Sequence, residues 1–221
     1  MESDNNKKPL NIIVLGRSGS GKGTQAKLIC ERFNLEYIGT GALLRDFSKK
    51  ENTAARKIKR DLAEGKLVPT WVAFFLWMEK LSQVPESKGI LFDGSPRKIR
   101  EAELLDDVLQ WYGRTNIKVV LVDISREEAI KRMINRRMCS RCGRSFYTSP
   151  DQKDIKCDNC GGDMIMRPED NPEAIEKRLN WFDEEVSRSI DFYEKQGVLV
   201  RVNGERPIED VFQDIVSALE K

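Results

Sequence analysis

Two hydrophobic patterns alternate along the chain. Short runs of consecutive apolar residues are typical of strands buried on both faces, and apolar residues that recur every three or four positions are typical of helices with one buried face. The first pattern predicts strands at 10–15, 90–92, 119–124 and 198–202. The second predicts helices at 22–33, 53–64, 70–82, 101–111, 127–137 and 172–195.

Local start signals support two of these helices. Ser125 and Glu128 form a capping box at the start of 127–137, and Asn171 followed by proline is a favoured start for 172–195. Strands that alternate with helices predict an α/β fold of three layers, with a parallel central sheet of about five strands covered by helices on both faces. In such folds ligands bind at the carboxyl ends of the strands.

One segment interrupts the alternation. Residues 139–166 are rich in Cys, Gly, Asp and Lys and poor in aliphatic residues, so they cannot form an apolar core of their own. Two Cys-x-x-Cys pairs in this segment, fourteen residues apart, have the spacing of a tetrahedral zinc site: Cys139, Cys142, Cys157 and Cys160. We therefore predict an inserted lobe held together by structural zinc. A pair of redox disulfides and an iron or iron–sulfur site are the alternatives.

Composition and charge narrow the class of protein. The 221 residues are 33% charged and 39% hydrophobic, and no apolar stretch approaches the ~20 residues that span a bilayer. The N-terminus is acidic and lacks an apolar core, so we expect a cytoplasmic protein without a signal peptide, a membrane partner or disulfides. The net charge of +2 is too balanced for a general nucleic-acid binder. The stretch 131–144 nevertheless holds six Lys and Arg and no acid, which indicates a compact anionic ligand.

A glycine-rich loop follows the first predicted strand and precedes the first predicted helix. Its sequence at 16–22, Gly-Arg-Ser-Gly-Ser-Gly-Lys, indicates a phosphate-binding loop. Backbone N–H groups and the helix N-terminus would surround a polyphosphate, and the lysine would bridge its outer phosphates. A glycine-rich turn without a ligand is the alternative. The nucleotide-binding residues predicted here are Gly16, Gly19, Ser20, Gly21, Lys22, Gly23 and Thr24.

The residues after the lysine point to one family. Gly-Lys-Gly-Thr-Gln at 21–25 resembles the nucleoside monophosphate kinases, adenylate kinase in particular, because GTPases and motor ATPases usually place Ser or Thr directly after the lysine. Further stretches of the family pattern follow in order at 40–45, 65–69, 93–97, 132–136 and 167–178. Over nearly its whole length the chain is similar to adenylate kinases with zinc in the lid. It departs from their pattern at Ser95, where phenylalanine is usual, and at Glu169, where aspartate is usual.

The resemblance implies an activity and a division of the chain. The activity is reversible phosphoryl transfer from ATP to AMP in a monomer, with Mg²⁺ accompanying ATP and with neither nucleic acid nor a membrane as partner. A monophosphate-binding lobe would occupy 40–68, and a zinc-binding lid 136–169. After a disordered tail at 1–9, the core phosphate-loop domain would comprise 10–39, 69–135 and 170–221.

The resemblance also implies roles for single residues. Arg132 and Arg206 would contact ATP beside the phosphate loop, and Asp93 would orient waters on Mg²⁺, a turn or capping aspartate being the alternative. The AMP site would comprise Thr40, Gly41, Arg45, Lys66, Val68, Gly94, Arg97, Glu101, Arg167 and Arg178. The groups around the transferred phosphoryl group would be Lys22, Arg97, Arg136, Arg167, Arg178 and Asp170.

The charges of these residues suit that reaction. ATP and AMP together carry about six negative charges at neutral pH. An AMP phosphate oxygen is already ionised at that pH, so phosphoryl transfer needs no general base. The chain contains no histidine, which excludes Ser-His and Cys-His catalysis and is compatible with this chemistry. The cations that the motifs supply are Lys22, Arg45, Arg97, Arg132, Arg136, Arg167 and Arg178.

The accepted base is an open question. Glu101 stands where the family usually has a glutamine that contacts the adenine edge, and an ionised carboxylate only accepts hydrogen bonds. Either Glu101 is protonated when AMP binds, or it turns away, or the acceptor is GMP or a pyrimidine nucleotide. A phosphate-loop ATPase that grips nucleic acid through the zinc lobe is the alternative from another class. Only Phe146 and Tyr147 offer stacking rings near that lobe.

Overall fold

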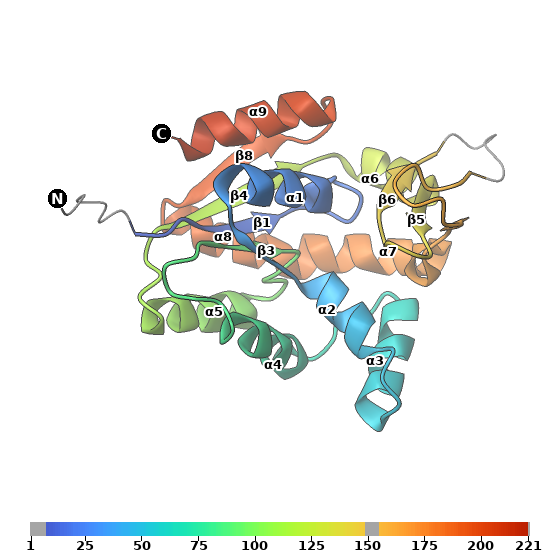
Figure 1. Ribbon diagram of the computed structural model, residues 1–221, viewed down its shortest axis with the longest axis horizontal. Helices are drawn as coiled ribbons and strands as arrows, with labels where there is room; N and C mark the ends of the chain where they lie inside the picture. The colour runs from blue at the N-terminus through green and yellow to red at the C-terminus, as the bar shows by residue number, and fades with distance from the viewer. Residues whose placement is uncertain (1–7, 149–154, 221) are drawn as a thin grey trace.

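The fold is built around one parallel sheet (Figure 1). The computed structural model describes residues 8–148 and 155–220. The central sheet has five parallel strands in the order β2-β3-β1-β4-β8. The predicted α/β fold with about five parallel strands is therefore confirmed. The strands are β1 Asn11–Leu15, β2 Glu36–Gly39, β3 Ile90–Asp93, β4 Ile117–Asp123 and β8 Leu199–Asn203.

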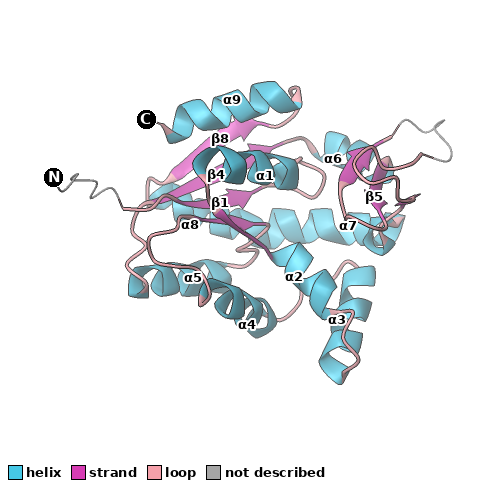
Figure 2. Cartoon of the chain, in the orientation of Figure 1, coloured by secondary structure: helices cyan, strands magenta, loops and turns pink. Residues whose placement is uncertain are grey.

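Helices cover both faces of this sheet (Figure 2). Successive strand residues point to opposite faces, so Ile12 and Val14 pack against α1 and α9, whereas Ile13 and Leu15 pack on the side of α4, α5 and α8. Within the described residues, no helix has the length and apolar character needed to cross a membrane. The covering helices are α1 Lys22–Phe33, α4 Thr70–Leu81, α5 Ile99–Trp111, α8 Ser187–Lys195 and α9 Ile208–Leu219.

The helix predicted at 172–195 is continuous but irregular. α7 Pro172–Trp181 passes into α8 through one π-helical turn, η2 Phe182–Val186. The predicted start is confirmed, because the Asn171 side chain accepts a hydrogen bond from the N–H of Ala174 at 2.9 Å. A π turn is frequently found at functional sites, and this one lies one helical turn after Arg178.

The helix predicted at 127–137 is shorter than expected. α6 spans Arg126–Ile134, and the side chain of Ser125 caps its first turn as the sequence predicts. The chain then enters β5 Arg136–Cys139, which pairs antiparallel with two further strands. Arg136, predicted to be helical, therefore lies on a strand, because strand pairing outweighs the helical pattern there.

Two lobes project from the carboxyl edge of the central sheet (Figure 1). One lies between β2 and α4 and consists of α2 Thr40–Phe47 and α3 Thr53–Ala63. The other is an antiparallel sheet in the order β6-β5-β7, after which the short turn η1 Pro168–Asp170 leads to α7. The two short strands of this sheet are β6 Ser145–Tyr147 and β7 Met164–Ile165. The lobes fall where the sequence predicts the monophosphate-binding lobe and the lid. The domain limits themselves stay predictions, and residues 1–7 of the predicted tail lie outside the described residues.

Candidate active site

A cleft of about 1270 Å³ opens at the carboxyl edge of the sheet. Its walls are the loop after β1, the end of β3, the start of α2 and the strands of the second lobe. The structure thus gathers stretches that lie far apart in the sequence around one cavity. The predicted site residues that line it are Gly16, Gly19, Gly21, Lys22, Gly23, Thr24, Gly41, Arg45, Asp93, Gly94, Arg97, Arg136, Arg167 and Arg178.

Close backbone packing explains two glycines of the phosphate loop. At Gly16, φ is +153°, and a Cβ atom would lie 2.5 Å from the carbonyl oxygen of Val122 in β4. At Gly23, a Cβ atom would lie 3.2 Å from a carboxylate oxygen of Asp93. A side chain at the first position would push the loop off the sheet, and one at the second would crowd the carboxylate. The loop therefore needs glycine at position 16, whereas at position 23 a Cβ atom would require the Asp93 carboxylate to shift by a few tenths of an ångström.

Lys22 begins α1 and reaches back across the loop. Its Nζ donates a hydrogen bond to the carbonyl oxygen of Arg17 at 3.1 Å. Burial lowers the pKa of Lys22 to about 7; the carboxylate of Asp93 opposes this, and the guanidinium groups of Arg97 and Arg178 add to it. An anion in the cleft would restore the charge of this lysine, because an opposite charge favours the protonated form.

Asp93 ends β3 with one carboxylate oxygen occupied and one open. Oδ2 accepts a hydrogen bond from the hydroxyl of Tyr37 at 2.6 Å. Oδ1 is buried and has no hydrogen-bond partner among the described residues. A buried carboxylate oxygen without a protein donor, beside a phosphate loop, fits a magnesium ion or the waters that such an ion keeps.

Asp170 joins two of the predicted arginines. Its carboxylate accepts hydrogen bonds from Nε of Arg136 at 2.8 Å, from Nη2 of the same residue, and from Nη1 of Arg178 at 2.9 Å. Burial alone would raise the pKa of Asp170, but the pairing with Arg136 and then with Arg178 holds it below its usual range. Asp170 lies behind the cleft wall, so in this arrangement it fixes two guanidinium groups that line the cleft.

Two further arginines lack a tight ion pair within the described residues. Nη1 of Arg45 lies 3.4 Å from Oε1 of Glu169. The guanidinium of Arg97 lies 5.5 Å from the ring centroid of Trp181, a distance at which a cation and an aromatic face attract. Neither contact is a tight ion pair, but Nε of Arg97 also donates a hydrogen bond to the carbonyl oxygen of Gly94 at 2.7 Å. Arg45 can therefore turn toward an anion, whereas Arg97 is fixed at Nε and offers its terminal nitrogens.

Of the residues predicted to bind nucleotide or to act in catalysis, eight do not line the cleft. Thr40 is buried, with its hydroxyl 2.5 Å from Oγ of Ser95, and it accepts a hydrogen bond from Nε1 of Trp77 at 2.9 Å. Arg132 and Arg206 form ion pairs with neighbouring acidic residues at 2.7 and 2.5 Å. The eight are Ser20, Thr40, Lys66, Val68, Glu101, Arg132, Asp170 and Arg206.

Glu101 turns toward the backbone. Glu101 is 3% exposed, and Oε2 of its side chain accepts a hydrogen bond from the N–H of Arg97 at 2.8 Å. Burial raises the pKa of Glu101, and the Arg97 N–H opposes that rise. The carboxylate thus holds the loop that carries Arg97. Of the three alternatives in the sequence, the one in which Glu101 turns away matches this arrangement.

The four predicted metal ligands come together in the second lobe. Their sulfur atoms lie within 4.8 Å of one another, with Cys139 to Cys160 at 3.4 Å and Cys142 to Cys157 at 3.6 Å. Four ligands at the ~2.3 Å zinc–sulfur distance would stand about 3.8 Å apart in a tetrahedron. Backbone hydrogen bonding, that of Arg144 first, lowers the pKa of Cys142 to about 6. All four are free cysteines that could hold a metal ion such as zinc.

Three aromatic residues of the site belong to no motif. Tyr37 holds Asp93, Trp181 faces Arg97, and the hydroxyl of Tyr147 donates a hydrogen bond to the carbonyl oxygen of Gly19 at 3.3 Å. The last contact brings the second lobe onto the phosphate loop. No sequence signal identifies these residues, because each acts through one side-chain contact between distant elements.

Comparisons with known proteins agree with this geometry. A family model described as adenylate kinase matches residues 14–198. The adenylate kinase of Methanothrix thermoacetophila is 38% identical over 215 residues, which covers 96% of this chain and 99% of that protein. The adenylate kinases of Archaeoglobus fulgidus and Oceanobacillus iheyensis are 36% and 38% identical, each over 96% of this chain and over 99% and 100% of their own. Since the family model covers the phosphate loop, both lobes and the helix from α7 to α8, and the relatives match over nearly the whole chain, the chain belongs to the adenylate kinase family.

Proposed function

We propose that the protein catalyses the reversible transfer of a phosphoryl group from ATP to AMP, giving two molecules of ADP. Family membership makes it a nucleoside monophosphate kinase, and the names of its relatives support AMP as the acceptor. The observation that carries the proposal is the set of cationic side chains that line one cleft beside the phosphate loop: Lys22, Arg45, Arg97, Arg136, Arg167 and Arg178.

The proposed step needs no proton transfer. An oxygen of the AMP phosphate attacks the γ-phosphorus of ATP, and the bond from that phosphorus to the β–γ bridging oxygen breaks. Both products are ADP, and the attacking oxygen is already ionised. The protein therefore acts by positioning the two phosphates and by neutralising the charge that spreads over the transferred group.

The contacts suggest how the cations divide this work. Arg45 and Arg97 would hold the acceptor phosphate, and Lys22 the outer phosphates of ATP. Arg136 and Arg178, fixed by Asp170, would surround the transferred group. Mg²⁺ bound with ATP would neutralise further phosphate charge, and Asp93 is the residue that would hold it or its waters.

We also propose zinc as the ion of the four-cysteine cluster, with a structural role. The four sulfur atoms fill all the positions of a tetrahedral site, and the surrounding lobe has little apolar material to fold around. The cytoplasmic location and the monomeric state stay predictions.

A panel of acceptors tests the proposed function. ADP formation from Mg²⁺-ATP would be followed with AMP, dAMP, GMP, CMP or UMP, and with no acceptor. We expect kcat/KM for AMP to exceed that for GMP at least tenfold, with two ADP formed for each AMP consumed. A preference for GMP would overturn the acceptor. ADP formation that needs no acceptor and rises with added nucleic acid would overturn the kinase reaction itself.

A further inference from the structure

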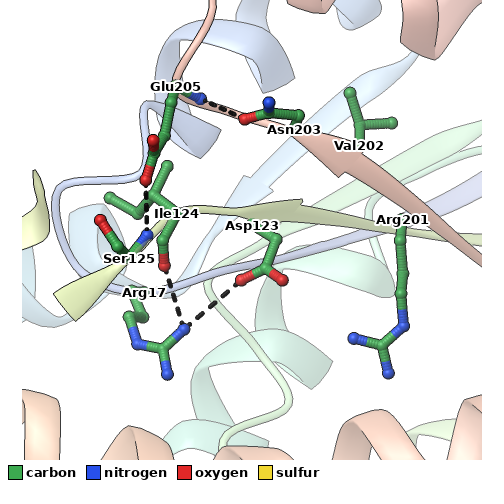
Figure 3. Close-up of a pocket in the computed structure, with 8 residues that line it drawn as sticks. All are labelled: Arg17, Asp123, Ile124, Ser125, Arg201, Val202, Asn203 and Glu205. Carbon is green, nitrogen blue, oxygen red and sulfur yellow. Dashed lines mark hydrogen bonds and ion pairs between the residues drawn. The ribbon is translucent and has the colours of Figure 1, made fainter.

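Arg17, the second residue of the phosphate loop, points away from the nucleotide cleft. Its side chain lies in a separate groove of about 500 Å³ at the end of β4 (Figure 3). Nη1 donates a hydrogen bond to the carbonyl oxygen of Ile124 at 3.1 Å and lies 3.4 Å from Oδ1 of Asp123. One edge of the guanidinium therefore holds the loop to the end of β4, the strand next to β1.

The other edge of the guanidinium reaches the π-helical turn η2, between α7 and α8. Nη2 donates a hydrogen bond to Oδ1 of Asp183 at 2.7 Å, and the guanidinium carbon lies 4.6 Å from the ring centroid of Phe182. The other oxygen of Asp183 accepts from Nη1 of Arg126 at 2.9 Å, so this carboxylate is itself fixed. Arg17 thus contacts the first two residues of the π-helical turn η2.

The π turn continues the helix that carries Arg178. Phe182 follows Arg178 by four residues, and residues four apart lie on one face of a helix. On the side of the phosphate loop, the backbone carbonyl oxygen of Arg17 accepts the hydrogen bond from Nζ of Lys22. Arg17 therefore connects the carbonyl oxygen that holds Lys22 with the face of the helix that carries Arg178.

We infer that Arg17 is a positioning residue for phosphoryl transfer: it sets the distance between the phosphate loop with Lys22 and the helix with Arg178. The inference rests on the proposed function, in which these two cations contact the transferred phosphoryl group. The side chain of Arg17 is 21% exposed, so solvent screens its ion pairs less than those of a surface arginine. Its planar fork can hold two partners at once, which lysine cannot.

The test compares Arg17→Ala, Arg17→Lys and Asp183→Asn with the wild type. Displacement of catalytic groups by about 1 Å costs up to ~100-fold in rate, so we expect Arg17→Ala to lower kcat 10–100-fold while KM for AMP stays within about twofold. Arg17→Lys should recover part of that loss. Because Arg17 and Asp183 share one contact, the loss of kcat in the double variant Arg17→Ala/Asp183→Asn should be smaller than the product of the two single losses. Arg201→Ala is the matched control, since Arg201 lines the same groove but pairs with Glu194.

Two further results decide the inference. If Arg17→Ala lowers only the melting temperature and leaves kcat unchanged, Arg17 only stabilises the fold and the inference is wrong. The inference is also wrong if the effects of Arg17→Ala and Asp183→Asn on kcat are additive in free energy. The affinity for inorganic tripolyphosphate, measured by calorimetry, needs no acceptor and so separates this inference from the proposed function. We expect it to fall at least threefold in Arg17→Ala and to stay unchanged in Arg201→Ala. Unchanged binding in both would overturn the inference even if ADP formation from AMP is confirmed.

Discussion

The pKa of Lys22 leads to a prediction about proton uptake. Without an anion beside it, the amine titrates near pH 7 because burial disfavours its charge. A bound polyphosphate favours the ammonium form and raises the pKa of Lys22 back toward the ordinary lysine value. At a pH between the pKa of Lys22 in the free protein and its pKa in the bound protein, binding must therefore be accompanied by the uptake of a proton at Lys22.

The lowered pKa of Lys22 sets the size of the effect. With a pKa of about 7, roughly 0.9 of the lysine is neutral at pH 8 and only about 0.1 at pH 6. Binding of Mg²⁺-ATP should thus take up about 0.9 proton at pH 8 and about 0.1 at pH 6. Since only the charged form binds the phosphates well, affinity should be about tenfold weaker at pH 8 than at pH 6, or ~1.4 kcal/mol.

Calorimetry in buffers of different ionisation enthalpy measures this uptake directly. Lys22→Met removes the titrating group, so the difference between wild type and variant isolates the lysine from the nucleotide's own phosphates. Lys27→Met, on the same helix and also lining the cleft, controls for the loss of a positive charge. Equal proton uptake by wild type and Lys22→Met at pH 8, or no uptake in either, would refute the reasoning.

Three other predictions concern the lid, the acceptor base and closure. Removal of zinc should lower the melting temperature by on the order of 5 °C or more, because metal binding supplies the folding free energy of the lobe. It should also make the four thiols of the metal cluster reactive, counted separately from Cys30. A melting curve unmoved after verified removal of zinc contradicts this. Glu101 turns away from the cleft, and glutamine keeps an oxygen for the Arg97 N–H, so Glu101→Gln should leave KM for AMP within about twofold, with the exposed Glu103→Gln as control; a fall of about fivefold or more would show that this side chain contacts the base. Two adenosines joined through five phosphates should reduce the radius of gyration in solution scattering, since transfer must exclude water; constant dimensions at saturation would indicate a rigid molecule.

Much of the site could be predicted because its residues lie in local motifs. The phosphate loop and the cysteine pairs each bring their ligands together within a few residues, so spacing alone indicates the chemistry. The position of Glu101 could not be predicted, because its partner is a backbone N–H whose direction depends on the turn before α5. Likewise Tyr37 reaches Asp93 from a neighbouring strand, fifty-six residues away in sequence.

Two elements of the fold could not be predicted either, because they depend on contacts with distant parts of the chain. β2 is not among the predicted strands. Glu36–Gly39 is only four residues long and half of it is partly exposed, so the sequence has no apolar run that indicates a strand there. The helix predicted at 127–137 continues in the sequence as a basic amphipathic pattern, and only pairing with residues farther along the chain turns its end into β5. Local patterns specify the long buried elements, whereas short elements depend on what they pair with.

The arginines of the cleft are accompanied by acids, and this bears on how fast nucleotides are captured. Asp170 lies between the guanidinium groups of Arg136 and Arg178, and Glu169 faces Arg45. Attraction over long distances depends on the summed charge of a region, so these carboxylates weaken the electrostatic steering that bare cations would exert. Association should therefore proceed at an ordinary rate with a shallow dependence on ionic strength. The strong contacts form after the encounter, as guanidinium groups exchange carboxylate oxygens for those of phosphate.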